Sequence, residues 1–287
     1  MIFRRETAWH HNMEENGMGT VWLTASGKGG VGKSTLTSAL GQALAGRNKR
    51  VLIMDMDVGL RGQDILLSLQ DRVVMDLMDV LDHHCEAEEA IIPSPGQDGL
   101  FLLPCPQFSR VKEISLKALG QMIRKLKGTY DFILMDAPAG VEKGLRNLLK
   151  LPLDEIILVV TPDDLCLRDA ERVISILDRK DLPAPKLLVN RLMPGLIERG
   201  EMISAASCAA SLDCMLLGEV PDDSSVYRAQ LNHFSLMELD CEARQAAVRI
   251  AGRMLGDNIP FPAYGHRRPW YSRMFHPMIG EVKRIDR

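Results

Sequence analysis

One stretch near the start of the chain has the residue types and spacing of a phosphate-binding loop. It fits the pattern G-x-x-x-x-G-K-[ST] and consists of Gly27, Lys28, Gly29, Gly30, Val31, Gly32, Lys33, Ser34 and Thr35. Glycines let consecutive backbone N–H groups converge on phosphate oxygens, and the start of the following helix adds a favourable dipole. Lys33 would bring a positive charge to the β- and γ-phosphates, and the Ser34 hydroxyl would ligate Mg²⁺. We therefore expect this loop to bind a nucleoside triphosphate.

Carboxylates stand at the ends of two apolar segments. The segment 51–55, VLIMD, ends in Asp55 and is followed by Asp57, and the segment 132–136, FILMD, ends in Asp136. A buried strand that ends in Asp places the carboxylate at the carboxyl edge of a sheet, where phosphates and Mg²⁺ bind in α/β proteins. Both segments therefore indicate one site shared with the phosphate-binding loop.

The elements that must position these residues alternate along the chain. Apolar segments alternate with amphipathic ones, which is typical of βα units and a parallel sheet. Runs such as IILVV favour strands covered on both faces. We predict an α/β protein of the P-loop NTPase class, with a mostly parallel twisted sheet and helices on both faces. The expected strands span residues 21–26, 51–55, 100–103, 132–136, 156–161, 186–190 and 215–220, and the expected helices 34–46, 115–126, 143–150, 165–177 and 241–255.

The 287 residues divide into three parts. Residues 20–256 contain every expected strand and helix without a linker, so we predict one P-loop domain there. Residues 1–19 are an extension that is disordered or follows from a misassigned start, because Met18 stands two residues before the first strand. Residues 257–287 form a basic tail. Six scattered cysteines without a C-x-x-C pair indicate reduced thiols in a cytoplasmic protein.

Lys28 is a second lysine in the loop, where phosphate binding needs only Lys33. Such a lysine is costly to hold unless an anion meets it. With Lys28, the loop resembles that of the MinD/ParA family of deviant Walker ATPases, whose hallmark is K-G-G-V-G-K-[ST], and the resemblance covers about residues 20–256. It implies ATP and Mg²⁺ as cofactors, slow ATP hydrolysis without a partner, and an ATP-bound homodimer. In that dimer Lys28 acts catalytically on the nucleotide of the partner subunit.

The carboxylate segments resemble the two switches of this family, D-x-D-x-G-L-R and D-[ST]-P-A-G. The resemblance implies that Asp57 positions the attacking water and belongs, with Ser34, to the magnesium site. It implies that Asp136 holds the Mg²⁺ shell through water. For Asp55, a structural hydrogen bond to the phosphate-binding loop and a catalytic role are both open.

Two departures from these patterns concern the rate of hydrolysis more than nucleotide binding. Gly62 and Gln63 follow Arg61 where the family usually has Asn, and Ala137 stands where serine is common. The second change removes a hydroxyl group. Neither change touches the phosphate-binding loop.

Two further strand ends resemble the adenine-contacting elements of the family. Asn190 and Arg191 end the segment LLVNR, and Pro221 and Asp222 end the next apolar segment. An asparagine amide can pair with a base edge, because it offers both donors and an acceptor. A turn at the end of a strand is the other interpretation of Asn190.

Several segments resemble the MinD branch more than the ParA branch. The segment LCLRDAERVI resembles V-R-D-[AS]-D-R on the MinD helix that binds the division inhibitor MinC, and Asp169 and Glu171 occupy its acidic positions. The resemblance implies a MinC-type partner, a MinE-type or scaffold regulator, and a switch that places the division septum. A solvated helix face without a partner is the alternative for these two residues.

The tail has the pattern of an amphipathic helix at a membrane surface, as in MinD proteins. Residues 266–287 carry six basic and two acidic residues, whereas residues 1–265 carry 29 basic and 36 acidic ones. Apolar residues near every fourth position with cations between them favour anionic headgroups. Pro277 and Gly280 interrupt the pattern, and an interior proline costs a helix about 3 kcal/mol, so a packed extension is the alternative. The residues predicted to enter the membrane are Trp270, Tyr271, Met274, Phe275, Met278, Ile279 and Val282.

These features imply a cytoplasmic protein that associates peripherally with the inner face of the cell membrane. An FlhG-like flagellar-number ATPase and a ParA-like DNA-partitioning ATPase are the main alternatives. The acidic body disfavours nucleic acid as a partner, because phosphate binding needs a concentrated positive field. An iron–sulfur scaffold is disfavoured, because it would need paired cysteines and the sequence has no C-x-x-C pair. A small-molecule kinase is a less favoured alternative that would use the same phosphate-binding loop.

Overall fold

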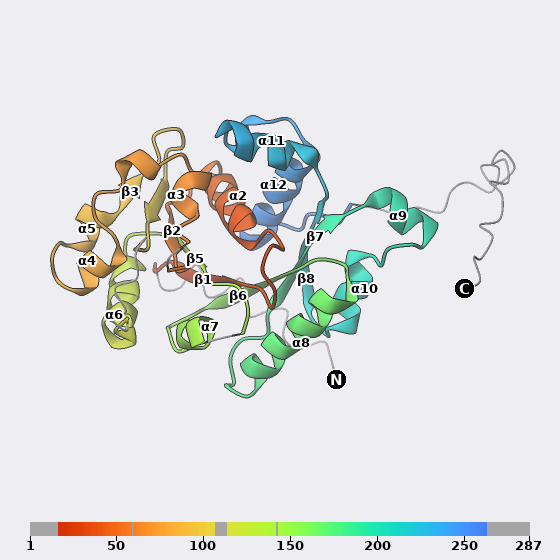
Figure 1. Ribbon diagram of the computed structural model, residues 1–287, viewed down its shortest axis with the longest axis horizontal. Helices are drawn as coiled ribbons and strands as arrows, with labels where there is room; N and C mark the ends of the chain where they lie inside the picture. The colour runs from red at the N-terminus through yellow and green to blue at the C-terminus, as the bar shows by residue number, and fades with distance from the viewer. Residues whose placement is uncertain (1–16, 59, 107–113, 142, 263–287) are drawn as a thin grey trace, which may run out of the picture.

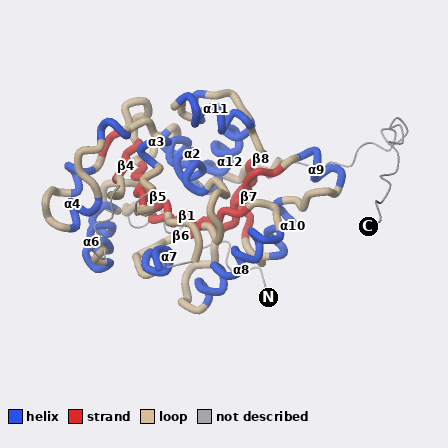
Figure 2. The backbone as a smooth tube through the Cα atoms, viewed as in Figure 1, coloured by secondary structure: helices blue, strands red, loops and turns tan. Residues whose placement is uncertain are grey.

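The computed structural model of the protein describes residues 17–58, 60–106, 114–141 and 143–262. Its centre is one eight-stranded sheet in the order β3-β4-β2-β5-β1-β6-β7-β8, which crosses the middle of the molecule (Figure 2). Neighbouring strands are parallel, except that β3 pairs antiparallel with β4. The strands are β1 (Thr20–Ala25), β2 (Val51–Asp55), β3 (Ile92–Pro93), β4 (Leu100–Leu103), β5 (Phe132–Asp136), β6 (Glu155–Val160), β7 (Lys186–Leu192) and β8 (Met215–Pro221).

Helices cover both faces of this sheet. They are α2 (Lys33–Ala45), α3 (Gln63–Leu66), α4 (Leu77–Leu81), α5 (Ala87–Ala90), α6 (Leu116–Leu126), α7 (Lys143–Leu148), α8 (Asp164–Asp178), α9 (Pro194–Arg199), α10 (Ala205–Ser211), α11 (Ser224–Asn232) and α12 (Glu242–Met254), with single 3₁₀ turns η2 (Gln70–Arg72) and η3 (Leu236–Glu238). Figure 1 shows α2, α11 and α12 on one face and α6, α7, α8 and α10 on the other. The predicted α/β fold with a parallel, two-sided sheet is confirmed.

All seven predicted strands and all five predicted helices are present, with ends within two residues of the prediction. The sequence did not predict β3 or the shorter helices. β3 has two residues at the edge of the sheet and includes Pro93, which an edge position tolerates because no neighbour needs its N–H. Five of the helices that were not predicted have four to seven residues, which is too short to show a 3.6-residue hydrophobic period, and the sixth, α11, has nine.

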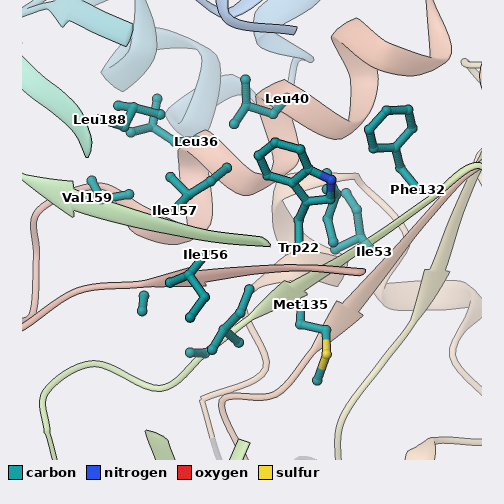
Figure 3. Packing of buried hydrophobic residues seen from close by; sticks show 14 of the residues in the cluster. Trp22, Leu36, Leu40, Ile53, Phe132, Met135, Ile156, Ile157, Val159 and Leu188 are labelled. Atoms are coloured by element: carbon teal, nitrogen blue, oxygen red, sulfur yellow. The ribbon is translucent and has the colours of Figure 1, made fainter. Parts of the chain in front are cut away.

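The core fills both faces of the sheet. Trp22 of β1 and Phe132 of β5 are fully or almost fully buried, with ring centroids 6.4 Å apart, and Trp22 points toward Leu40 of α2 (Figure 3). Ile156 and Met135 point to the opposite face in the same view, because successive side chains of a strand alternate. Burial of each large apolar side chain stabilises the fold by about 1.5–3 kcal/mol.

α2 is buried almost all round, because α12 covers the side that the sheet leaves free. Small residues allow this close packing. A Cβ atom on Gly41 of α2 would lie 2.6 Å from Ile53 Cδ1, and one on Gly218 of β8 would lie 2.2 Å from Ile250 Cγ1 of α12. The helix that carries Lys33 and Ser34 is therefore fixed rigidly against the sheet.

The chain turns after α12 and lies against the body as far as Phe261. Gly256 takes a φ of 90° at the end of the helix. The Arg253 guanidinium donates to the carbonyls of Leu217, Ile259 and Pro260 and stacks 3.9 Å from the ring centroid of Phe261. The predicted membrane residues 270–282 and most of the predicted N-terminal extension lie outside the described residues. Within the described residues, every helix is too short or too polar to cross a bilayer.

We predict that Gly218→Ala destabilises the protein by about 1–3 kcal/mol, the usual cost of overpacking a core. The added methyl group would overlap Ile250. Urea unfolding followed by circular dichroism measures the change, and Gly96→Ala is the matched control, because its added Cβ meets nothing within 4 Å. Equal stability of the two glycine variants would contradict this packing.

Candidate nucleotide-binding site

The predicted site residues come together at the carboxyl edge of the sheet. The phosphate-binding loop follows β1, which lies between β5 and β6. Because neighbouring strands are parallel, the ends of β2, β5, β6, β7 and β8 open to the same edge. They carry Asp55, Asp136, Asp163, Asn190 and Asp222 at or just beyond the strand ends. The strand order reverses around β1, which is where open α/β sheets bind ligands.

The loop has the backbone conformation of a phosphate cradle. Gly30 and Gly32 take φ angles of 77° and 93°, which other residues rarely adopt. Among the described residues, no group accepts a hydrogen bond from the backbone N–H groups of residues 28–34. Such a series of unpaired N–H groups at the start of a helix binds anions.

Lys33, Ser34 and Asp136 form the centre of the site. The Lys33 ammonium, 6% exposed, lies 2.5 Å from Asp136 Oδ1 and 3.2 Å from Ser34 Oγ. A lysine carries three N–H donors, so these two contacts leave one for a phosphate oxygen. Asp136 is at the end of β5, and its own backbone carbonyl accepts from Met56 N. The structure thus brings the loop into direct contact with residues 136–140, which we call the second switch.

Asp55 holds the segment of residues 57–63, which we call the first switch. The sequence left open a hydrogen bond from Asp55 to the phosphate-binding loop, whereas the structure shows bonds to this segment. Asp55 Oδ2 accepts the N–H groups of Gly62 and Gln63 at 2.9 and 3.0 Å, and its Oδ1 accepts from Asp57 N. Burial raises the pKa of Asp55, the N–H donors of Gln63 and Asp57 oppose the rise, and the charge of Asp136 adds to it. The hydrogen bonds of Asp55 therefore go to its own segment and not to the phosphate-binding loop, and a catalytic role stays a prediction.

Asp57 lies half-buried on the same side of the site. Burial raises the pKa of its carboxyl group, the positive charge of Lys33 lowers it, and the charge of Asp136 raises it further. The buried Cys105 thiol donates to the Asp57 carbonyl at 3.3 Å, and burial with the nearby Asp55 raises the pKa of that thiol. Cys105 is therefore an uncharged support of the switch. All six cysteines are free, as predicted.

Gln63 was marked in the sequence only as a departure from the family pattern. Its side chain is fully buried, and Nε2 donates to Asp136 Oδ2 at 2.7 Å and to Ser34 O at 3.0 Å. It thus joins the first switch to the second switch and to the loop. The other departure, Ala137, is fully buried and continues the backbone pairing of β5 with Thr24 of β1.

Asn190 and Arg191 occupy an irregularity near the end of β7. The register of β7 on β8 shifts between Val189 and Leu192, and Arg191 takes a φ of 60°. Such bulges re-aim side chains near sites. Asn190 Nδ2 donates to Val31 O of the loop at 2.8 Å and lies where a Cβ on Gly32 would stand. Together with Gly32 and Thr35, these residues line a pocket that also contains Pro221 and Asp222.

The two lysines of the loop face different surroundings. Lys33 is directed to the buried Asp136, whereas the half-buried Lys28 lines an open groove with Pro162, Asp163 and Arg191. Burial acts to raise the pKa of Asp163, but hydrogen bonds from Thr161 Oγ1 and Cys166 N and the charge of Lys28 lower it overall. Lys28 therefore stands at the outer side of the loop.

The predicted partner-binding residues lie on α8, beside the start of the loop. A Cβ atom on Gly27 would lie 2.5 Å from the Asp169 carbonyl oxygen and 2.8 Å from its Cβ. The Asp169 carboxylate accepts from Arg172 Nη1 at 3.0 Å, and Glu171 is exposed. The predicted partner surface and the nucleotide site thus share a backbone contact.

The residues present fit a nucleotide with Mg²⁺. The unpaired N–H groups and Lys33 suit phosphates, and Gln63 Oε1 is a buried acceptor that has no partner among the described residues. No three carboxylate, histidine or cysteine side chains of the described chain gather into a metal site of their own. Mg²⁺ in nucleotide sites typically takes only one or two protein ligands, with phosphate oxygens and waters completing its shell. Ser34 would be such a ligand.

A parallel sheet with this glycine-rich loop after β1 defines a P-loop nucleoside triphosphatase. The sequence profile of the ParA family, described as NUBPL iron-transfer P-loop NTPase, matches residues 17–254. The chain is 35% identical to the septum site-determining protein MinD of Helicobacter pylori over 264 residues, which cover 90% of this chain and 98% of that protein. The chain therefore belongs to the ParA family of P-loop NTPases and, within it, to the MinD proteins.

Solved structures agree. The MinC:MinD cell division protein complex of Aquifex aeolicus is 34% identical, with a TM-score of 0.80, and the match covers 86% of this chain and all of that one. MinD of Pyrococcus horikoshii complexed with Mg-ADP is 28% identical, with a TM-score of 0.73 and coverage of 84% and 100%. ATP and Mg²⁺ are the cofactors of the family. The iron-transfer role belongs to the protein named in the description of the profile and is not assigned to this chain.

We predict that Asn190→Ala weakens nucleotide binding about tenfold. It removes one hydrogen bond to the loop, typically worth about 1–1.5 kcal/mol when its partner stays buried. Titration of a fluorescent ATP analogue measures the affinity. Asn232→Ala is the matched control, because Asn232 Nδ2 donates to a backbone carbonyl, Arg228 O, at the exposed end of α11. Unchanged affinity in Asn190→Ala would show that this tether does not support the loop.

Proposed function

We propose that the protein is an ATP-driven switch of cell division: it dimerises on ATP, binds the membrane, recruits a MinC-type inhibitor and so places the septum. The observation that carries the proposal is the loop with two lysines in different surroundings, Lys33 at the buried Asp136 and Lys28 at the outer groove. The similarity to MinD proteins along nearly their whole length supports it.

The chain's own groups would bind and orient the substrate. The N–H groups of residues 28–34 and Lys33 would hold the phosphates, and Asn190, Arg191, Pro221 and Asp222 would surround the base. Ser34, Asp57 and Asp136 would hold the magnesium site. Bound Mg²⁺ neutralises the charge that develops on the β- and γ-phosphates.

Asp57 would orient the water that attacks the γ-phosphate and accept its proton. Burial raises the pKa of this carboxyl group, which makes the carboxylate a better proton acceptor than an exposed one. Hydrolysis on one subunit is expected to be slow, because its own Lys28 stands at the outer groove. The homodimer would bring Lys28 to the nucleotide of the partner subunit, as in the family's ATP-bound dimers.

The contact of Gly27 with α8 supports a link between nucleotide and inhibitor. Phosphate binding would hold the loop through its backbone N–H groups, and the loop begins against the Asp169 backbone. A change in the loop would therefore reach the helix that carries Asp169 and Glu171, the surface we propose for a MinC-type protein. The MinC:MinD complex of Aquifex aeolicus, with its similar fold, agrees with this kind of partner.

We propose that the tail beyond residue 262 provides the membrane contact at the inner face of the cell membrane. Arg253 fixes its point of departure next to α12. One short amphipathic segment binds a membrane weakly, whereas two in one dimer raise the effective concentration at the surface. ATP binding would thereby raise the affinity of the protein for the membrane, and a MinE-type or scaffold regulator would release it from the membrane.

Liposome co-sedimentation tests the membrane switch. We expect wild type to pellet with phosphatidylglycerol-rich vesicles in ATP but not in ADP. Lys28→Ala should lose most of the ATP dependence, and deletion of residues 266–287 should lose binding under both conditions. Lys117→Ala, an exposed lysine of α6, is the control. Equal binding in ATP and ADP, or no loss on deletion, would contradict the proposal, and ATP-dependent, salt-sensitive DNA binding would favour the partitioning alternative.

Charge reversal on α8 tests the inhibitor surface. Glu171→Lys should weaken ATP-dependent capture of the MinC-type protein of the same organism by tenfold or more, because a like charge replaces a complementary one at an interface. Asp178→Lys, at the far end of the same helix and also exposed, should leave capture unchanged. ATP binding should stay normal in both variants. Equal capture by both would exclude this face.

A further inference from the structure

Gln63 joins three parts of the site: the end of β2, the end of β5 and the phosphate-binding loop. It begins α3, and its backbone N–H is fixed by Asp55 Oδ2 at the end of β2. Its amide nitrogen reaches the second switch at Asp136 and the backbone of the loop at Ser34. These contacts are between residues that are 29 and 73 positions apart.

The orientation of the Gln63 amide follows from its partners. A carboxylate and a backbone carbonyl are both acceptors, so only the NH₂ group can face both, and its two hydrogens are then used. The oxygen Oε1 therefore makes neither of these two hydrogen bonds. It is buried and has no hydrogen-bond partner among the described residues. A buried amide oxygen without a donor is costly, and its donor is expected to come from a ligand or its waters.

We propose that Gln63 Oε1 accepts a hydrogen bond from a water of the Mg²⁺ shell, and that Gln63 is the positioning residue through which Mg–ATP orders the first switch. Mg²⁺ keeps several of its waters when it binds to a nucleotide, and their hydrogens need acceptors. Oε1 lies on the same amide group whose nitrogen donates to the carboxylate of Asp136 and to the backbone carbonyl of Ser34, and both residues are proposed to hold the metal.

This assignment rests on the proposed nucleotide site and deepens it. Asp136 would be held from two sides, by Lys33 at Oδ1 and by Gln63 at Oδ2. With Mg²⁺ and ATP present, the switch segment gains one more bond, at Oε1. Without Mg²⁺, the nucleotide gives Gln63 no new donor. The coupling should therefore depend on the metal and not on the phosphates alone.

The test compares Gln63→Met with wild type. Methionine keeps an unbranched side chain of similar length but offers no amide donor or acceptor. The measurement is a calorimetric titration of Mg²⁺ into the protein bound to a non-hydrolysable ATP analogue. We expect the affinity for Mg²⁺ to fall about tenfold, the usual effect of removing a group that orients metal ligands. Affinity for the analogue in excess EDTA should stay within twofold. Gln121→Met, on the exposed face of α6, is the control.

Gln63→Glu separates the two halves of the amide. It places a carboxylate oxygen where the amide nitrogen donated to Asp136 Oδ2 and Ser34 O, so the two carboxylates repel each other and we expect a switch that is less protected before Mg²⁺ is added. Hydrogen exchange of residues 60–69 reads this directly: wild type should gain protection on Mg²⁺ addition, and Gln63→Met should not. Thermal unfolding without nucleotide checks that each variant is folded.

The outcomes distinguish this inference from the proposed function. If wild type does not bind the analogue, the proposed function fails. If wild type binds it and Gln63→Met has the same Mg²⁺ affinity and the same gain in protection, only the role of Gln63 is overturned. An equal loss of affinity with and without Mg²⁺ would also overturn it, because Gln63 would then act through the shape of the loop.

Discussion

The buried pair of Lys33 and Asp136 is the interaction on which the site depends. A charge at the base of a phosphate cradle is expensive to remove from water unless an opposite charge meets it with good geometry. The strand order supplies that partner, because β5 lies directly beside β1 although more than 100 residues separate them. Ser34, Asp57 and Gln63 are arranged around this pair. The sheet itself thus places the negative and positive groups together.

Local sequence was sufficient to predict the central sheet and to identify the residues of the phosphate-binding loop. Apolar runs such as VLIMD and FILMD are buried on both faces, and the motif has a fixed conformation in its strand–loop–helix context. The observed strands and longer helices therefore agree with those expected. Local sequence did not predict α3, α4 or β3, because elements of two to five residues carry no period that distinguishes them from loops.

The contacts that give the site its coupling could not be predicted, because they join residues far apart in the chain. The acidic end of β2 was recognised, but the N–H donors that Asp55 accepts were not. Gln63 was noticed as unusual, yet its bond to Asp136 follows only from the approach of β2 to β5. The position of Asn190 at the loop depends on a bulge in β7, which apolar patterning does not reveal. The roles of Asp57 and Lys28 are still predictions.

The absence of a side chain at Gly27 lets the loop press directly against the backbone of α8. Such a contact transmits in both directions, because the free energy that couples two sites is the same whichever ligand binds first. If the nucleotide raises the affinity of α8 for a partner, the partner must raise the affinity of the loop for the nucleotide by the same factor. An inhibitor docked on α8 would then prolong the ATP-bound state that recruited it, and release would need a third party that acts on hydrolysis.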